Sequence, residues 1–279
     1  MQVRFWGVRG SIPTPGPETV RYGGNTTCVE LVLESGAHLI LDAGTGIRRL
    51  GRSLVASGVR PIHAHLFLTH SHWDHTHGFP FFAPAFIQGT RLDVHGCQDG
   101  ETALQDILSR QMTQQYFPVD FSELRAEITF NTCTSACARI DPAAVSRLRL
   151  NHPGTGCGYR FEAEGKVVVF LTDNELVPGG PQANGPALEF ARDADLLIHD
   201  AQYTPEDIDA HRGWGHSCYV DVVDLALLAG VRHLVLFHHD PERSDEQVDD
   251  IQAAARAQVD AIGGNLRCDA AAEGMVLEI

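Results

Sequence analysis

The feature of the sequence that most constrains its fold is a short histidine-rich run, FLTHSHWDHTHG, at residues 67–78. It overlaps HAHLFLTH (63–70), an apolar stretch typical of a buried strand, so the run begins where that strand ends. Burying so many imidazole and carboxylate groups without partners would be costly. Four side chains of this run therefore require polar partners or a metal ion: His70, His72, Asp74 and His75.

The spacing of these four residues predicts two pairs of metal ligands. His70 and His72 lie on one side of an extended strand end because side chains alternate with a period of two, whereas Asp74 and His75 follow a turn. Imidazole and carboxylate suit borderline divalent ions, and the lack of cysteine in the run argues against a purely structural zinc site. Four ligands on one loop form part of a site, so further ligands are expected downstream.

Three downstream residues meet this expectation. His152 in LRLNHPGTG, Asp173 in VVVFLTDNE and His238 in LVLFHHDP each follow an apolar strand-like stretch. In folds built from parallel strands, binding sites lie at the carboxyl ends of the strands. His239, the next residue, is the alternative to His238.

Strand and helix patterns alternate along the chain and predict an α/β (α+β) fold with two sheets packed face to face and helices outside. The chain contains no Ser/Gly-rich or charged linker, so we expect residues 1–279 to form a single domain. The segment 98–144 fits the pattern least well and is predicted to be an insertion. Strands are expected at 3–8, 27–34, 38–44, 63–70, 158–165, 166–175, 194–203 and 231–240, and helices at 47–58, 186–194, 220–229 and 245–262.

The composition argues against some classes of binding partner and indicates a cellular location. A formal net charge of −15 argues against a large nucleic-acid or membrane surface. The N-terminal stretch MQVRFWGVRGSIPTPGP lacks the continuous apolar core of a secretory signal, and we expect a cytoplasmic protein with no membrane association. Seven cysteines at irregular spacings do not predict a disulfide framework. The apolar stretch FPFFAPAF (79–86) is either core or the interface of a homodimer.

The order of the predicted ligands resembles the metallo-β-lactamase superfamily: HxHxDH, a distant histidine, an aspartate after an apolar strand and a late histidine. The resemblance spans essentially the whole chain. It implies a four-layer αββα sandwich of metallo-β-lactamase type with two divalent metal ions, zinc as the first choice and manganese or iron as alternatives. The resemblance also favours His238 over His239 as the last ligand. It assigns His70, His72 and His152 to one ion, Asp74, His75 and His238 to the other, and Asp173 to both.

Within this superfamily, the stretches HDAQYTPED (199–207) and HRGWGHSCYVDVVDLALLAGVRHLVLFHHDP (211–241) are similar to the phosphodiesterase branch, which includes ribonuclease Z and cyclic nucleotide phosphodiesterase-like hydrolases. In this branch a histidine in an HS motif, oriented by an acidic residue, acts in catalysis. The matching residues are His216 and Asp200. The resemblance implies a phosphodiesterase that attacks with a metal-bridging hydroxide, oriented by Asp74, and uses His216 as the general acid.

The expected substrate is a small phosphodiester, a cyclic nucleotide or a related cyclic phosphate. Ribonuclease Z relatives commonly have glutamate where Asp200 stands and threonine or serine where Cys218 stands, and this chain has no basic Gly/Pro-rich arm to hold tRNA. A tRNA 3′-processing endonuclease and a lactone or thioester hydrolase on the same metal site are the alternatives. Tyr116 and Phe117, in the predicted insertion, either stack on a base or anchor a loop.

Overall fold

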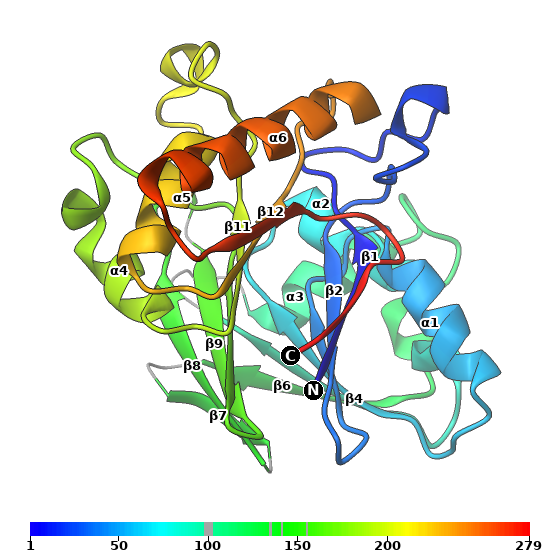
Figure 1. Cartoon of the computed structure of the whole chain (residues 1–279). Coiled ribbons are helices and arrows are strands. Elements are labelled where there is room, and N and C mark those ends of the chain that lie inside the picture. The colour runs from blue at the N-terminus through cyan, green and yellow to red at the C-terminus, as the bar shows by residue number, and fades with distance from the viewer. Residues whose placement is uncertain (98–102, 134–135, 141, 155) are drawn as a thin grey trace.

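The computed structural model describes residues 1–97, 103–133, 136–140, 142–154 and 156–279, with side chains left undescribed at 136–137. Within these ranges the chain forms two seven-stranded sheets that pack face to face, with helices on both outer faces (Figure 1). This is the four-layer sandwich that the sequence predicts.

The first sheet has the strand order β14-β1-β2-β3-β4-β5-β6. Its strands are antiparallel from β14 to β3 and parallel from β3 to β6. Parallel strands deliver their carboxyl ends to the same edge, so the residues after β3 and β4 emerge side by side. The strands are β1 (Gln2–Gly7), β2 (Cys28–Val32), β3 (His38–Leu41), β4 (His63–Leu68), β5 (Arg91–Gly96), β6 (Glu127–Thr132) and β14 (Val276–Glu278).

The second sheet has the order β13-β12-β11-β10-β9-β8-β7. Strands β10 to β13 are parallel, whereas β7 to β10 are antiparallel. The carboxyl ends of β10, β11 and β12 therefore share one edge. The strands are β7 (Ala136–Ile140), β8 (Ala143–Arg149), β9 (Cys157–Ala163), β10 (Lys166–Leu171), β11 (Leu196–Asp200), β12 (His233–Phe237) and β13 (Arg267–Ala270).

Three apolar clusters hold the four layers together. One lies between the sheets and contains Phe67 and Phe161, whose rings meet edge to face at 5.2 Å. A second joins the second sheet to α4, α5 and α6, and a third joins the first sheet to α1 and α3. The helices are α1 (Ile47–Ala56), α2 (Trp73–Thr76), α3 (Leu104–Ser109), α4 (Gly185–Ala191), α5 (Tyr219–Leu228) and α6 (Asp245–Ile262).

Helix α6 has the bounds that its sequence predicts because both ends carry strong signals. Ser244 caps the first turn by accepting the backbone N–H of Gln247, whose side chain accepts the N–H of Ser244 in return. Gly263 ends the helix in the left-handed conformation that glycine adopts at little cost.

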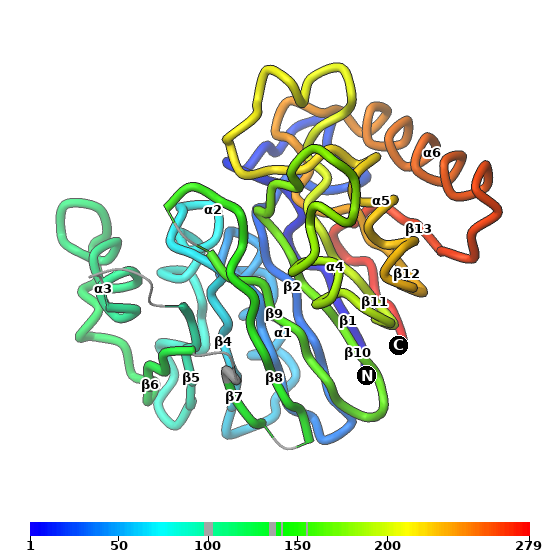
Figure 2. The backbone as a smooth tube through the Cα atoms, turned by 90° about the vertical axis from the view of Figure 1, so that its left-hand side faces the viewer, coloured from blue at the N-terminus to red at the C-terminus, as the bar shows by residue number. Residues whose placement is uncertain are grey.

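The predicted insertion at 98–144 contains both peripheral and sheet structure. Helix α3 and its following turns lie at one side of the molecule, beyond β5 and β6 (Figure 2). Strands β6 and β7 are edge strands of the two sheets, paired with β5 and β8. The insertion at 98–144 therefore stays a prediction. Residues 98–102, 134–135 and 141 of this segment lie outside the described ranges.

One disulfide bond corrects the interpretation of the cysteines. Cys97, just after β5, is bonded to Cys157 at the start of β9, with their Cα atoms 6.3 Å apart. The two residues are 60 positions apart, and only the packing of one sheet on the other brings them together. Cys133 is buried, whereas the side chain of Cys137 lies outside the described part.

The apolar stretch 79–86 forms two short 3-10 turns under the first sheet. Phe79 and Phe82 are fully buried there, whereas Phe81 is half exposed. Most of this stretch is therefore core, and a homodimer stays a prediction. Among the described helices, none combines the length and the apolar character that crossing a bilayer requires.

Candidate metal centre

The carboxyl ends of strands from both sheets meet at one edge, and the seven predicted ligands converge there. His70 follows β4, Asp173 follows β10 and His238 directly follows β12. His72 precedes α2, whose residues include Asp74 and His75. His152 lies between β8 and β9. The structure thus brings together all seven residues from segments far apart in the sequence.

Their donor atoms form two groups, within each of which all atoms lie within 4.8 Å of one another. In the first group, Nε2 of His152 is 3.1 Å from Nδ1 of His72. In the second, Nε2 of His238 is 3.1 Å from Oδ2 of Asp74. The first group is His70, His72, His152 and Asp173, and the second is Asp74, His75, Asp173 and His238.

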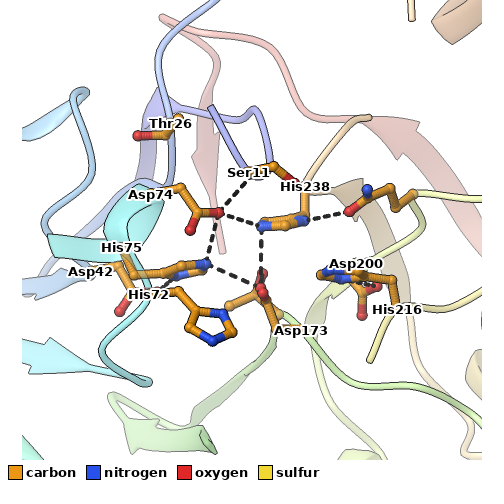
Figure 3. A network of polar contacts seen from close by, with 12 residues as sticks. Ser11, Thr26, Asp42, His72, Asp74, His75, Asp173, Asp200, His216 and His238 are labelled. Carbon is orange, nitrogen blue, oxygen red and sulfur yellow. Dashed lines mark hydrogen bonds and ion pairs between the residues drawn. The ribbon is translucent and has the colours of Figure 1, made fainter. Parts of the chain in front are cut away.

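Asp173 belongs to both groups and faces each with a different oxygen. Oδ2 lies 3.5 Å from Nε2 of His70 and 3.8 Å from Nε2 of His152. Oδ1 lies 3.3 Å from Nε2 of His75 and 3.2 Å from Nε2 of His238 (Figure 3). A carboxylate placed in this way can bridge two cations.

Most of the histidines use Nδ1 for a protein contact and turn Nε2 toward the centre. Nδ1 of His75 lies 2.8 Å from Oδ2 of Asp42, and Nδ1 of His238 lies 3.0 Å from Oε1 of Gln202. Nδ1 of His152 lies 3.2 Å from the carbonyl oxygen of Gly215. Such contacts fix the tautomer and the ring orientation of metal-binding histidines.

The burial and pairing of these atoms fit divalent cations. Nε2 of His70 and Nε2 of His75 are buried, and the described residues offer neither of them a hydrogen-bond partner. Burial raises the pKa of Asp173, but the nearby histidines, His238 and His75 first, outweigh it and hold the pKa well below its usual range. A divalent cation held between the carboxylates of the centre and the two Nε2 atoms would give all of them a partner. This set of imidazole and carboxylate donors suits zinc, manganese or iron.

The backbone is strained at the same edge. Asp42, Asp173 and His238 adopt positive φ values of 60°, 55° and 59°, and Ser11 has a φ of 61°. Residues other than glycine adopt this left-handed region rarely, and such strain concentrates at functional sites. Ser11 also donates its backbone N–H to Oδ2 of Asp74 at 2.7 Å. The strained positions thus aim side chains and an amide at the centre.

His216 and Asp200, the predicted acid and its orienting carboxylate, lie next to the two groups (Figure 3). The ring of His216 is stacked 5.0 Å from that of His238 and lies 5.4 Å from that of His152. Nδ1 of His216 is 3.5 Å from Oδ2 of Asp200, which is ion-pair distance but longer than a good hydrogen bond. Asp200 is held in place by the backbone N–H groups of Asn174 and Ser217, at 3.0 and 2.8 Å.

The charges around His216 favour its protonated form. Burial lowers the pKa of His216, but the Asp200 carboxylate, with Asp173 and Asp74, outweighs burial and raises the pKa above its ordinary value. Burial raises the pKa of Asp200, whereas His199 and His216 hold it below its usual range. Asp200 and His216 thus each favour the charged form of the other.

His239, the alternative ligand, points away from the centre. Its Nε2 donates to the carbonyl oxygen of Ala271 at 2.8 Å, and its ring meets Tyr22 edge to face. His239 belongs to neither donor group, which favours His238.

Two residues of the site were not found from the sequence. Asp42 ends the apolar stretch HLILD, as Asp173 ends a similar stretch, and this shared pattern could have identified it. Gln202 has no comparable signal, because its contact with His238 spans 36 residues.

Comparison with known families agrees with this geometry. The sequence model of the beta-lactamase superfamily domain matches residues 38–239, most of the chain. The chain belongs to this superfamily. The predicted family, and with it the predicted class of metal-dependent hydrolase, is confirmed.

Two curated superfamily relatives carry the name ribonuclease Z. The protein from Geobacillus kaustophilus is 24% identical over 92% of this chain and 94% of its own length. The protein from Haloferax volcanii is 26% identical over 85% of this chain and 84% of its own length.

Solved structures of the superfamily share the fold over the whole chain. The metallo-β-lactamase fold protein YhfI from Bacillus subtilis is 18% identical with a TM-score of 0.71, covering 100% of this chain and 99% of its own. The short form of human tRNase Z is 20% identical with a TM-score of 0.68, at the same coverage. A diphosphatase of the PhnP family is 16% identical with a TM-score of 0.68, covering 100% of this chain and 97% of its own.

Proposed function

We propose that this superfamily member is a dinuclear metal-dependent phosphodiesterase that hydrolyses a small phosphodiester, a cyclic nucleotide or a related cyclic phosphate. The observation that carries the proposal is the His216–Asp200 pair beside the two donor groups. Hydrolysis of a carbonyl ester does not require a separate acid of this kind, whereas expulsion of an alkoxide from a phosphodiester does.

In this proposal the seven donor residues hold two divalent cations, with zinc as the first choice. When bound, such cations lower the pKa of a water molecule and neutralise phosphate charge. Asp173 would contribute to both sites, because its two carboxylate oxygens face different donor groups. The N–H of Ser11 and Nε2 of His238 fix Oδ2 of Asp74, so that this carboxylate can orient the attacking water.

His216 protonates the leaving oxygen. Its Nδ1 faces Asp200, so Nε2 is the atom that transfers the proton. Asp200 holds the ring in place through Nδ1 and favours the imidazolium form, as carboxylates do for catalytic histidines. Asp200 is fully buried and accepts two backbone N–H groups, which hold its carboxylate in the orientation that faces His216.

Two adjoining cavities support a small substrate with an aromatic group. A cavity of about 430 Å³ contains the donor residues Asp74, Asp173 and His238. A second cavity of about 430 Å³ shares Ser71 and Trp73 with it. Trp73 and Tyr116 are exposed aromatic residues of this second cavity, and a nucleobase can stack on such side chains.

The leaving group provides the test. Cyclic nucleotides expel a ribose alkoxide that needs a proton, whereas bis(p-nitrophenyl) phosphate expels a stable phenolate. With zinc or manganese present, we expect His216→Ala to lose about 100-fold or more in kcat on the cyclic nucleotides that the wild type accepts. The loss on the nitrophenyl ester should be much smaller. His38→Ala, a histidine paired with Glu30 away from the centre, serves as the control.

Equal losses on both substrates would contradict the role of His216 as the acid. A metal-loaded wild type that hydrolyses a lactone or thioester but no phosphodiester would overturn the phosphodiesterase proposal.

A tRNA 3′-processing endonuclease is the second candidate, favoured by the ribonuclease Z names of the curated relatives. A net charge of −15 argues against the large RNA surface that this activity uses. Cleavage of a precursor tRNA at a kcat/KM well above that for every cyclic phosphodiester would replace the first candidate with the second. The cytoplasmic location stays a prediction.

A further inference from the structure

A second cluster of metal-ligand side chains lies at the opposite end of β4 from the metal centre. We propose that His63, His65 and Asp93, with His95, bind a transition-metal ion of the Zn²⁺ class. The site is separate from the proposed catalytic function and does not depend on it.

The two strands place these residues on one face. His63 and His65 are two positions apart on β4, so their side chains point to the same side of the sheet. Asp93 on β5 pairs directly with His65 in the parallel ladder, and His95 pairs with Phe67. Phe67 belongs to the core between the sheets, so the cluster faces the same inter-sheet space, at its rim.

The donor atoms of His63, His65 and Asp93 all lie within 4.8 Å of one another, so one ion could contact all three, and His95 adjoins this group through His65. Nε2 of His63 lies 2.7 Å from Oδ2 of Asp93, and Nδ1 of His65 lies 3.6 Å from the same oxygen. Nε2 of His95 lies 3.3 Å from Nδ1 of His65. In a tetrahedral zinc site with bonds of 2.0–2.1 Å, neighbouring donors are about 3.3 Å apart. Small shifts of the half-exposed His63 and the partly buried Asp93 would bring their donor atoms to that spacing.

The surroundings hold the ligands in place. Thr129 donates its hydroxyl to Oδ1 of Asp93, which leaves Oδ2 to face the histidines. The ring of His95 is buried and stacked on Phe67 at 4.5 Å and 14°. Nδ1 of His95 is buried and has no hydrogen-bond partner among the described residues, whereas Nε2 faces Nδ1 of His65, the side on which the ion would lie.

The cluster is accessible and is remote from the metal centre. His63 is half exposed, and a cavity of about 280 Å³ is lined by His38, His63 and His65. His65 and His70 are five residues apart, roughly 16 Å along an extended chain. In Figure 2 the first residues of β4 and β5 lie below the end of β4, from which the chain continues to α2. Imidazole donors favour Zn²⁺, Co²⁺, Ni²⁺ or Cu²⁺ over Mg²⁺ and Ca²⁺.

Zinc counting tests this site. The full chain, stripped with a chelator, is equilibrated with Zn²⁺ by dialysis, and bound zinc is measured by mass spectrometry. We expect the wild type to bind one more Zn²⁺ per chain than His63→Ala or Asp93→Asn, or these variants to bind that ion at least about tenfold more weakly. Their activity toward a phosphodiester should equal that of the wild type. His38→Ala, a histidine of the same cavity that contacts Glu30, should bind as the wild type does.

A variant with a disrupted metal centre distinguishes the ion at the second cluster from the ions of the centre. The double variant His152→Ala, Asp173→Ala disrupts both donor groups of the centre and should retain one zinc ion. Adding His63→Ala should remove it, with circular dichroism confirming that the fold is kept. Zinc counts that do not change with His63→Ala in either background would overturn the proposal.

Discussion

Nε2 of His238 lies 3.1 Å from Oδ2 of Asp74, although 164 residues separate them in the sequence. Asp74 belongs to α2 after the first sheet's β4, whereas His238 follows β12 of the second sheet. The second donor group therefore forms only when the two sheets pack together. Binding of a cation there should be coupled to the stability of the whole sandwich.

This coupling predicts that metal removal lowers stability. A cation that binds the folded chain alone stabilises it by about 2.7 kcal/mol at a free concentration of 100 times its Kd. We expect a chelator to lower the midpoint of urea denaturation and zinc to restore it. Asp173→Ala should show a clearly smaller response. An identical midpoint for the metal-loaded and stripped wild type would contradict this coupling.

Asp173→Ala should abolish most of the activity because Asp173 contacts both donor groups. Loss of a residue that merely orients a ligand costs about 10–100-fold, and loss of a shared ligand should cost more. We expect kcat/KM for a phosphodiester to fall by more than about 100-fold, with fewer metal ions bound. Asp209→Ala, which changes a highly exposed aspartate, is the control. Full metal content in Asp173→Ala would speak against its bridging role.

Two glycines of one loop give a matched pair of variants. Gly213 and Gly215 both have positive φ, at 86° and 89°, so alanine strains the backbone at either position. A Cβ at Gly215 would lie 2.0 Å from Nδ1 of His152, whereas a Cβ at Gly213 meets open space. Gly215→Ala should therefore weaken metal binding and activity much more than Gly213→Ala. Similar zinc titrations for the two variants would show that His152 is not displaced.

Variants of the adjacent residues His238 and His239 distinguish a metal ligand from a histidine with a structural role. His238→Ala should lose metal and activity, because Nε2 of His238 contacts both Asp74 and Asp173. His239→Ala should retain the metal but unfold at lower temperature, because it removes a buried ring and its hydrogen bond to Ala271. Metal analysis and thermal denaturation of both variants check this assignment. Loss of metal from His239→Ala alone would reverse it.

Trp73 should determine affinity for aromatic substrates. It is 83% exposed and is shared by the two cavities. Stacking of a base on an aromatic side chain contributes about 1–3 kcal/mol, so Trp73→Ala should raise KM for a cyclic nucleotide by about 5–100-fold. Trp73→Phe should restore part of this affinity. A KM that Trp73→Ala leaves unchanged would place the base elsewhere.

The main elements of the fold and the seven donor residues could be predicted because their signals are local. The strands that lead to the centre are apolar runs, and the side chain that follows each run lies at the sheet edge. This relationship holds for His70, Asp173 and His238, and it also applies to Asp42. The capping residues of α6 set its bounds in the same local way.

The remaining features depend on contacts between distant segments. The Cys97–Cys157 bond and the His238–Gln202 contact exist only after the sheets have packed. Strands β5, β8, β13 and β14 lie outside the ranges expected for strands. Strands β6 and β7 were not expected either, because they are edge strands in a segment without a clear apolar run. Their pairing with β5 and β8 supplies the stability that their sequences do not indicate.

Anomalous X-ray scattering from crystals grown with manganese or zinc tests the central claim, that Asp173 joins two cations. We predict two peaks at the centre, about 3.5–4 Å apart, one beside each carboxylate oxygen of Asp173. A single peak, or cations bound by His70, His75 and His238 without Asp173, would contradict it.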